Sequence, residues 1–322
     1  MNLKYAFAAL VVLGLHLPES YGADSYPNKP IRIVISFPPG GPTDSSIRII
    51  SAKLGEIMKQ PIYIENRPGA GGNIGTQLVA RAEPDGYTFL ASSSAFAVNP
   101  SMYGPKAGYD PIKDFIPVVV VSTQPNVVSV NERVPAKTLA ELNTLAKTGK
   151  LSFSSPGSGT TPHLTCENIF HVMWKSDMVH VPYKGAGPAS LAVVSGETPV
   201  ACTAAFGVFQ FHKQGKVRIL GISSDKRLAN LPDVPTFAEL GYAEINDYTW
   251  TTIFAPAGTP AAIVEKMNLA INEVLSLQEF KDKLDTGGLI PVGGTLTETS
   301  SYIASEIKRW SQVVKTTGAK PE

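Results

Sequence analysis

The chain has 322 residues, of which 43% are hydrophobic and 17% are charged, and its formal net charge is +1. This composition is typical of a globular protein, the length allows two domains with cores of their own, and the neutral balance gives no reason to expect nucleic acid or an acidic surface as a partner. Residues 1–22 have the pattern of a cleaved export signal, because Lys4 precedes an apolar run and Ser20, Tyr21 and Gly22 form a cleavage site. The apolar run is too short for a membrane span, so we expect the mature protein to be soluble and exported.

The first predicted elements form a strand–loop–helix unit. A β-branched strand at 31–36 is followed by a Pro- and Gly-rich loop at 37–44 and a helix at 45–58, with Thr43 and Asp44 suited to cap that helix. The first N–H groups of a helix lack partners and its dipole favours negative charge, so this loop can hold a carboxylate or phosphate with backbone donors alone. Many such loops bind nothing, and by itself this one is only a candidate anion site.

A glycine-rich stretch at 69–75 connects a predicted strand at 61–65 to a predicted helix at 74–82. It resembles a loosened dinucleotide-binding loop, but no acidic residue closes the following strand, where a partner for the ribose would lie. We therefore expect these glycines to serve helix packing and to bind no nucleotide. The next strand, at 87–91, ends in the serine run 92–94, at the strand end where open α/β sheets bind ligands.

The strand–loop–helix unit recurs in the second half of the chain. Strands at 118–122 and 126–130 are separated by a short segment where the chain can cross into a second domain. After a helix at 139–147, a strand at 151–154 leads into a Gly-, Pro- and hydroxyl-rich loop at 155–163 and then into another helix. The two loops, one in each domain, can face each other across a cleft.

The remaining elements also alternate between strand and helix, which indicates an α/β architecture with largely parallel sheets. Further strands are expected at 179–182, 198–204, 217–223 and 249–256, and further helices at 188–195, 260–276, 278–285 and 297–315. We predict a discontinuous first domain, residues 24–122 plus 249–322, and an inserted second domain, residues 126–246.

Cys166 and Cys202 are the only cysteines. Export permits a disulfide, but two cysteines so far apart in the sequence are not thereby close in space, and we expect two buried thiols. No group of Cys and His residues has the spacing of zinc ligands, so neither a metal nor a cofactor is predicted.

Ordered motifs along the whole mature chain resemble those of the periplasmic solute-binding proteins of tripartite tricarboxylate transporters, the Bug family. The matching stretches are 26–31, 37–44, 65–75, 84–87, 99–103, 155–163, 180–187, 231–235 and 254–260. The resemblance implies a two-domain Venus-flytrap fold of the type II periplasmic-binding class. It also implies a carboxylate held in the interdomain cleft, partly by backbone amides and ordered water.

Two departures from the family pattern bear on the ligand. Phe96 replaces a His that many relatives carry, and residues 203–206 lack an Asp that relatives often carry near the end of that strand. Both changes make the expected cleft less polar and leave room for a flat or aromatic acid. We expect Phe96 and Phe206 to help set the class of ligand by stacking on it.

The leading function is that of a non-catalytic solute-binding protein. It would capture a small carboxylate, either a dicarboxylate or an aromatic acid, for uptake through a membrane permease of the tripartite type. We expect the mature chain to be a monomer that binds no nucleic acid.

The alternative function is that of a secreted serine hydrolase acting on small esters, with Ser158 as nucleophile and His163 nearby. The Gly-x-Ser-x-Gly spacing is absent, however, and no orienting carboxylate can be assigned.

The residues expected to bind the ligand follow strand ends in both domains. They are Phe37, Pro39, Gly40, Gly41, Thr43, Asp44, Ser92, Ser93, Phe96, Asn99, Ser155, Gly157, Ser158, Thr160, Thr161, His163, Tyr183, Lys184, Gly185, Ala205 and Phe206. Neither facing loop contains Lys or Arg, so backbone N–H groups and hydroxyls must meet the anion, and Lys184 is expected to be solvated. Binding should therefore depend only weakly on salt.

Overall fold

The computed structural model describes residues 26–321, so the predicted export signal lies outside the described residues. The strands are β1 (Ile31–Ile35), β2 (Ile62–Asn66), β3 (Thr88–Ser93), β4 (Phe115–Asn131), β5 (Ser152–Ser155), β6 (Val179–Pro182), β7 (Val200–Ala204), β8 (Val217–Ile222), β9 (Tyr248–Pro256) and β10 (Ile290–Gly293). The α-helices are α1 (Pro42–Met58), α2 (Asn73–Ala80), α3 (Ala95–Tyr103), α4 (Leu139–Thr148), α5 (Thr161–Glu167), α6 (Ala186–Ser195), α7 (Ala205–Lys213), α8 (Ala261–Ser276), α9 (Gln278–Thr286) and α10 (Leu296–Thr317). Two short 3₁₀ helices, η2 (Ala70–Gly72) and η3 (Gly104–Ala107), and a π-helical turn, η4 (Asn168–Met173), complete the set.

The strands form one curled sheet in the order β2-β1-β3-β9-β4-β7-β5-β6, with β8 and β10 also paired to β4. Strand pairing is parallel toward both ends, at β2-β1-β3 and at β7-β5-β6, as expected for α/β units. The centre is antiparallel, because the chain crosses the molecule along β4 and returns along β9. The expectation of largely parallel sheets therefore holds only for the two ends.

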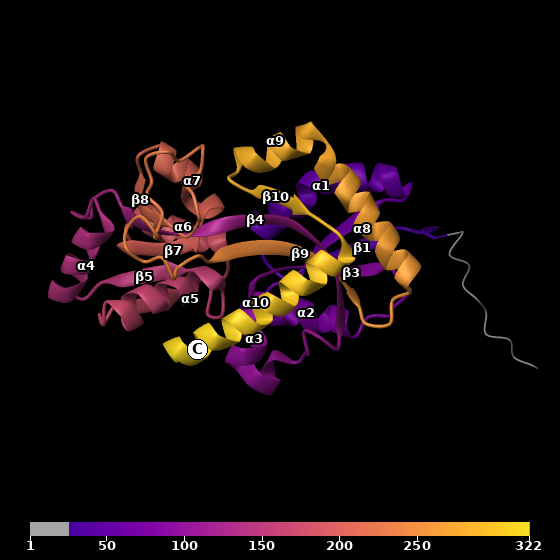
Figure 1. Cartoon of the computed structure of the whole chain (residues 1–322), viewed down its shortest axis with the longest axis horizontal. Coiled ribbons are helices and arrows are strands. Elements are labelled where there is room, and N and C mark those ends of the chain that lie inside the picture. The colour runs from indigo at the N-terminus through magenta and orange to yellow at the C-terminus, as the bar shows by residue number, and fades with distance from the viewer. Residues whose placement is uncertain (1–25, 322) are drawn as a thin grey trace, which may run out of the picture.

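The molecule has two halves joined by β4 and β9, as Figure 1 shows. The first half contains β1, β2, β3, β10 and helices α1, α2, α3, α8, α9 and α10; the second contains β5 to β8 and helices α4 to α7. The crossing expected near residues 123–125 is part of the single 17-residue strand β4, in which Pro125 pairs with Tyr248 of β9. The two predicted strands of this region are thus one.

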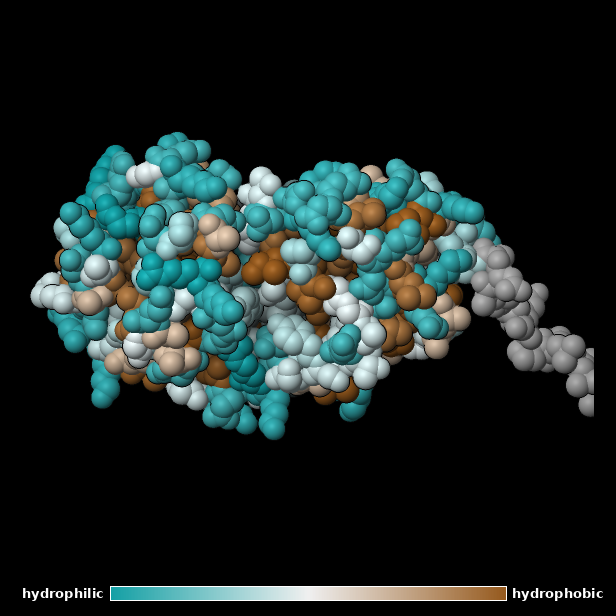
Figure 2. All heavy atoms as spheres, turned by 45° about the horizontal axis from the view of Figure 1, so that its top comes forward, coloured by the Kyte–Doolittle hydropathy of each residue, from teal (hydrophilic) through white to brown (hydrophobic). Residues whose placement is uncertain are grey.

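Each half buries apolar side chains on both faces of its part of the sheet, because helices cover both faces. In the first half, α1, α8 and α9 enclose one cluster and α2, α3 and α10 another. In the second half, α4, α5 and η4 cover one face and α6 and α7 the other. Figure 2 shows one side of the molecule, where hydrophilic side chains cover much of both halves and hydrophobic ones show between them on each half and also where the halves meet. None of the helices within residues 26–321 combines the length and apolar character needed to cross a bilayer.

The two cysteines form a disulfide, and the expectation of two thiols was wrong. Cys166 of α5 and Cys202 of β7 are both buried, with Cα atoms 6.2 Å apart. The reason is tertiary: α5 packs across β7, so residues separated by 36 positions face each other inside the second half.

Candidate ligand-binding cleft

A cavity lies between the two halves and is lined by loops from both. Its lining residues follow the C-terminal ends of β1, β3, β5, β6 and β7, with one contribution from β9. They are Phe37, Pro38, Pro39, Gly41, Pro42, Thr43, Ser93, Ser94, Pro156, Thr160, Thr161, Pro162, Gly185, Ala186, Gly187, Pro188, Ala204 and Thr249. This is the place where open α/β sheets bind ligands.

Five helices begin at this cavity. The N-cap residues of α1, α3, α5, α6 and α7 are Gly41, Ser94, Thr160, Gly185 and Ala204, and all five line it. The first N–H groups of each helix lack intrahelical partners, and each helix dipole places partial positive charge at this end. The cavity therefore has the electrostatic character of an anion site.

The N-cap side chains of the five helices do not cap these donors, although other side chains accept two of them. The Ala95 N–H of α3 donates to Ser93 Oγ at 3.2 Å, and the Phe206 N–H of α7 donates to Gln124 Oε1 at 2.9 Å. None of their N-cap residues accepts a hydrogen bond from its helix through a side chain within the described chain. Two helices that begin away from the cavity are fully capped: Thr138 and Glu141 form a capping box on α4, and Thr295 and Glu298 form one on α10. The first-turn N–H groups without such an acceptor remain available to a ligand.

Of the lining residues, all of which lie inside the described range, none carries a charge. Most lining hydroxyls are already engaged within the protein. Ser94 bonds Thr161 at 2.7 Å across the two halves, Thr161 bonds Thr249 at 2.8 Å, and Thr160 donates to the Gly157 carbonyl at 2.8 Å. Six prolines line the cavity and offer no N–H, so the donors are confined to a few backbone positions.

Asp44 was expected to cap α1, but the helix begins earlier. Gly41 is the N-cap and Pro42 is the first helical residue, which places Asp44 inside the first turn. Its carboxylate accepts hydrogen bonds of 2.9 Å from the Gly40 N–H, from Arg48 Nε and from Asn66 Nδ2. Burial alone would raise the pKa of Asp44, but the bonds from Arg48, Gly40 and Asn66 outweigh it and hold the pKa below its usual value. Asp44 thus fixes the loop while its charge is matched by Arg48.

Some of the residues expected to bind the ligand line the cavity and others do not. Those that line it are Phe37, Pro39, Gly41, Thr43, Ser93, Thr160, Thr161 and Gly185. Those that are not part of the lining are Gly40, Asp44, Ser92, Asn99, Ser155, Gly157, Ser158, His163, Tyr183, Lys184 and Ala205, besides the two phenylalanines. Lys184 is exposed, as its solvated role requires.

Phe96 and Phe206 do not reach the cavity, which corrects the expectation that they stack on a ligand. Phe96 is only 1% exposed and its ring stacks on Phe254 with centroids 4.2 Å apart. Phe206 is half-buried against the core of the first half, where a Cβ added to Gly287 would lie 3.0 Å from its ring. Both residues lie in the first turn of a helix that the sequence did not predict, α3 or α7, and the helical turn directs their side chains away from the strand end.

The glycine-rich stretch at 69–75 has two structural uses. Gly75 lets α2 pack against the end of β1, since a Cβ there would lie 2.8 Å from the Ser36 Cα. Gly71, with φ of 62°, lets the second half approach closely, because a Cβ there would lie 2.9 Å from the Ser158 carbonyl oxygen. The hydroxyl of Tyr103 donates to that same carbonyl at 3.3 Å. That this stretch binds no nucleotide stays a prediction.

The lining residues that were not among those expected to bind the ligand are Pro38, Pro42, Ser94, Pro156, Pro162, Ala186, Gly187, Pro188, Ala204 and Thr249. The prolines flank the residues that were named, so reading each loop to its helix start would have included them. Thr249 had no local signal, because it arrives on the return strand β9 from a distant part of the chain.

The pair that a hydrolase would need is not formed. Ser158 Oγ has no hydrogen-bond partner among the described residues, and His163 Nε2 instead faces Glu167 Oε1 at 3.3 Å. A different Ser–His pair exists, with Ser155 Oγ 2.6 Å from His180 Nε2. Ser155 has no exposed surface, so its hydroxyl cannot meet a substrate.

The comparison with protein families decides the relationship. Residues 46–319 match the model of the tripartite tricarboxylate transporter family receptor. The chain belongs to this family. Among its receptors and their relatives, protein BugT of Bordetella pertussis is 36% identical over 328 residues, 99% of each chain.

Solved structures agree with this assignment. The periplasmic binding protein BugD superposes with a TM-score of 0.87 at 28% identity, covering 92% of this chain and all of BugD. Rpa4515 of R. palustris, solved with adipate, superposes with a TM-score of 0.87 at 32% identity and the same coverage, 92% and 100%. The expected two-domain periplasmic-binding fold is confirmed, whereas the domain boundaries stay a prediction.

Proposed function

We propose that this receptor is a non-catalytic periplasmic protein that captures a small dicarboxylate in the cavity between its halves and delivers it to a membrane permease. The observation that carries the proposal is the convergence of five helix N-termini, none capped by the side chain of its own N-cap residue, on a lining without charged side chains. Such a site stabilises an anion with fixed backbone dipoles and costs little side-chain entropy.

The distribution of the donors supports a ligand with two carboxylates. Helices α1 and α3 begin on one side of the cavity and α5, α6 and α7 on the other, so each half can receive one carboxylate. The proline side chains between them suit an apolar linker. Adipate, the ligand in the Rpa4515 structure, has this form. An aromatic acid is less favoured. Two phenylalanines were expected to stack on it, and neither lines the cavity.

The proposal is tested with a panel of mono- and dicarboxylates that includes adipate. A ligand that binds only the folded state raises the melting temperature, and calorimetry on the positive compounds gives the affinity and stoichiometry. We expect linear dicarboxylates to raise the melting temperature and monocarboxylates of the same length to do so less. If no carboxylate binds, or if monocarboxylates bind best, the proposal is wrong.

Substitutions at two glycines distinguish a loss of binding caused at the cavity from one caused by a damaged fold. Gly41 lines the cavity, has an ordinary φ of −82°, and has room for a Cβ, whose nearest neighbour would be the Pro38 carbonyl at 3.7 Å. Gly41→Val should therefore fold and lose binding. Gly149→Val is the matched control, because Gly149 lies at the far end of α4 with similar space. Lys184→Ala should keep the affinity, and loss of binding in that variant with retention in Gly41→Val would contradict the backbone mechanism.

A further inference from the structure

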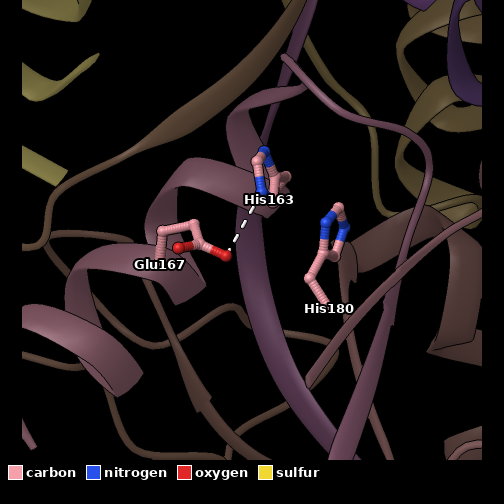
Figure 3. A group of neighbouring side chains, drawn as sticks. All are labelled: His163, Glu167 and His180. Atoms are coloured by element: carbon pink, nitrogen blue, oxygen red, sulfur yellow. Dashed lines mark ion pairs between the residues drawn. The ribbon is translucent and has the colours of Figure 1, made fainter. Parts of the chain in front are cut away.

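Three histidines gather around one buried glutamate behind the second-half binding loop, residues 155–161. His163 Nε2 lies 3.3 Å from Glu167 Oε1, and His171 Nδ1 lies 2.6 Å from Glu167 Oε2. His180 of β6 stacks on His163 with ring centroids 4.0 Å apart. Figure 3 shows His163 and Glu167 on α5 and the ring of His180 reaching toward them from the neighbouring strand.

Both stacked rings bond to the binding loop. His180 Nε2 lies 2.6 Å from Ser155 Oγ, which also accepts the Gly157 N–H at 3.2 Å. His163 Nδ1 accepts the Gly159 N–H at 3.4 Å. The loop so held supplies Pro156, Thr160 and Thr161 to the cavity lining and leads directly into the N-terminus of α5. Its shape sets where these three lining residues lie.

The protonation states that these contacts require are consistent with one another. His163 Nδ1 accepts the Gly159 N–H, so the ring's hydrogen is on Nε2. That N–H donates to the Glu167 carboxylate. Burial alone would raise the pKa of Glu167, but hydrogen bonds from His163 and His171 outweigh burial and lower it to about 2. Burial, followed by the neighbouring His163, lowers the pKa of His180 to about 3, so this ring is neutral and can accept the Ser155 hydroxyl proton at Nε2.

A metal site is the other use of such a cluster. His163, Glu167 and His180 offer ligand atoms that all lie within 4.8 Å of one another. The two rings, however, are stacked with only 21° between their planes. The nitrogen lone pairs lie in those planes, so they run side by side instead of converging on one ion. One nitrogen of each ring is also already bonded to the loop.

We propose that the stacked His163–His180 pair, oriented by Glu167, positions the binding loop so that its lining residues Pro156, Thr160 and Thr161 meet the ligand. These are positioning residues, because none of the three lines the cavity. The inference rests on the proposed function, since it takes the loop to be part of the ligand site. It adds a set of side chains behind the cavity on which the affinity depends.

The test compares two substitutions of one ring. His180→Phe keeps an aromatic ring for stacking and removes the bond to Ser155. His180→Gln places a polar group where Nε2 was and can restore that bond. With adipate, or the strongest dicarboxylate of the panel, we expect His180→Phe to weaken binding about tenfold, the effect of one lost hydrogen bond. His180→Gln should recover most of the affinity, although the two unliganded variants melt at similar temperatures.

Amide NMR makes the result independent of the ligand. In the unliganded protein, the Gly157 and Gly159 amide resonances should shift in His180→Phe and return toward their wild-type positions in His180→Gln. Failure of all carboxylates to bind, with these shifts present, would refute the proposed function and leave the loop mechanism standing. Equal affinities in wild type and His180→Phe, or unmoved Gly157 and Gly159 amides, would overturn the positioning role. A stoichiometric rise in melting temperature with Zn²⁺ that Glu167→Gln abolishes would replace it by a metal site.

Discussion

Truncating Phe96 should cost stability and leave ligand preference unchanged. The side chain is 1% exposed, and besides Phe254 its ring contacts Phe115 and Tyr109 at centroid distances of 5.2 and 5.3 Å. Removing a buried phenylalanine loses its transfer free energy and leaves a cavity, together about 3–5 kcal/mol of unfolding free energy. For a chain of this size, that corresponds to a fall in melting temperature on the order of 10 °C.

The assay for Phe96→Ala is urea unfolding, followed by calorimetry with the dicarboxylate panel well below the melting temperature. Phe206→Ala is the matched control: it is half-buried, lies outside the cavity lining and should lose less stability. Both variants should rank the ligands as the wild type does. A small loss of stability with a changed ligand order in Phe96→Ala would show that this ring faces the ligand and that the position assigned to it is wrong.

Three further outcomes follow from the structure. Replacing Cys166 and Cys202 with alanine should lower the unfolding free energy by about 3–4 kcal/mol in urea titrations, since the disulfide closes a long loop; equal stability would count against the bond. The lowered pKa of Glu167 contributes stability that is present above its ordinary value of 4.5 and is lost as the pH falls toward 2. The lowered pKa of His180 likewise makes stability decline as the pH falls from 6.5 toward 3, because only the unfolded chain takes up the proton there. Glu167→Gln and His180→Phe should each flatten its own part of the stability–pH curve, and unchanged curves would contradict the shifts. Ligand affinity should change by no more than about twofold between low and high salt, because the lining carries no charge to be screened; a steep salt dependence would point to a charged partner.

Local sequence patterns were sufficient for the strand–loop–helix units. β1 and β5 are short strands, each followed by Pro and Gly and then by a helix, and these signals depend only on neighbouring residues. Residues of both loops line the cavity between the halves. The return strand, expected at 249–256, is β9 at Tyr248–Pro256.

Features decided by tertiary packing could not be predicted in this way. Helix α3 is buried nearly all round and contains Pro100, so it shows no amphipathic period. The disulfide and the position of Thr249 depend on which distant segments meet, and no spacing in the sequence carries that information. The direction in which the Phe96 side chain points could not be predicted either, because it depends on whether a helix or a loop follows β3.

Strands β4 and β9 join the halves as one continuous hydrogen-bonded ladder, not as two free linkers. The pairing register between β4 and β9 shifts twice, once between Pro117 and Val119 and once between Val120 and Ser122. A regular ladder resists shear, whereas such bulges bend and twist the strands locally. We therefore expect the halves to separate by rotation about this short part of the ladder, with little sliding. The geometry of ligand release is then the same for every ligand, and chemically different acids should differ in how long they stay bound more than in the path by which they leave.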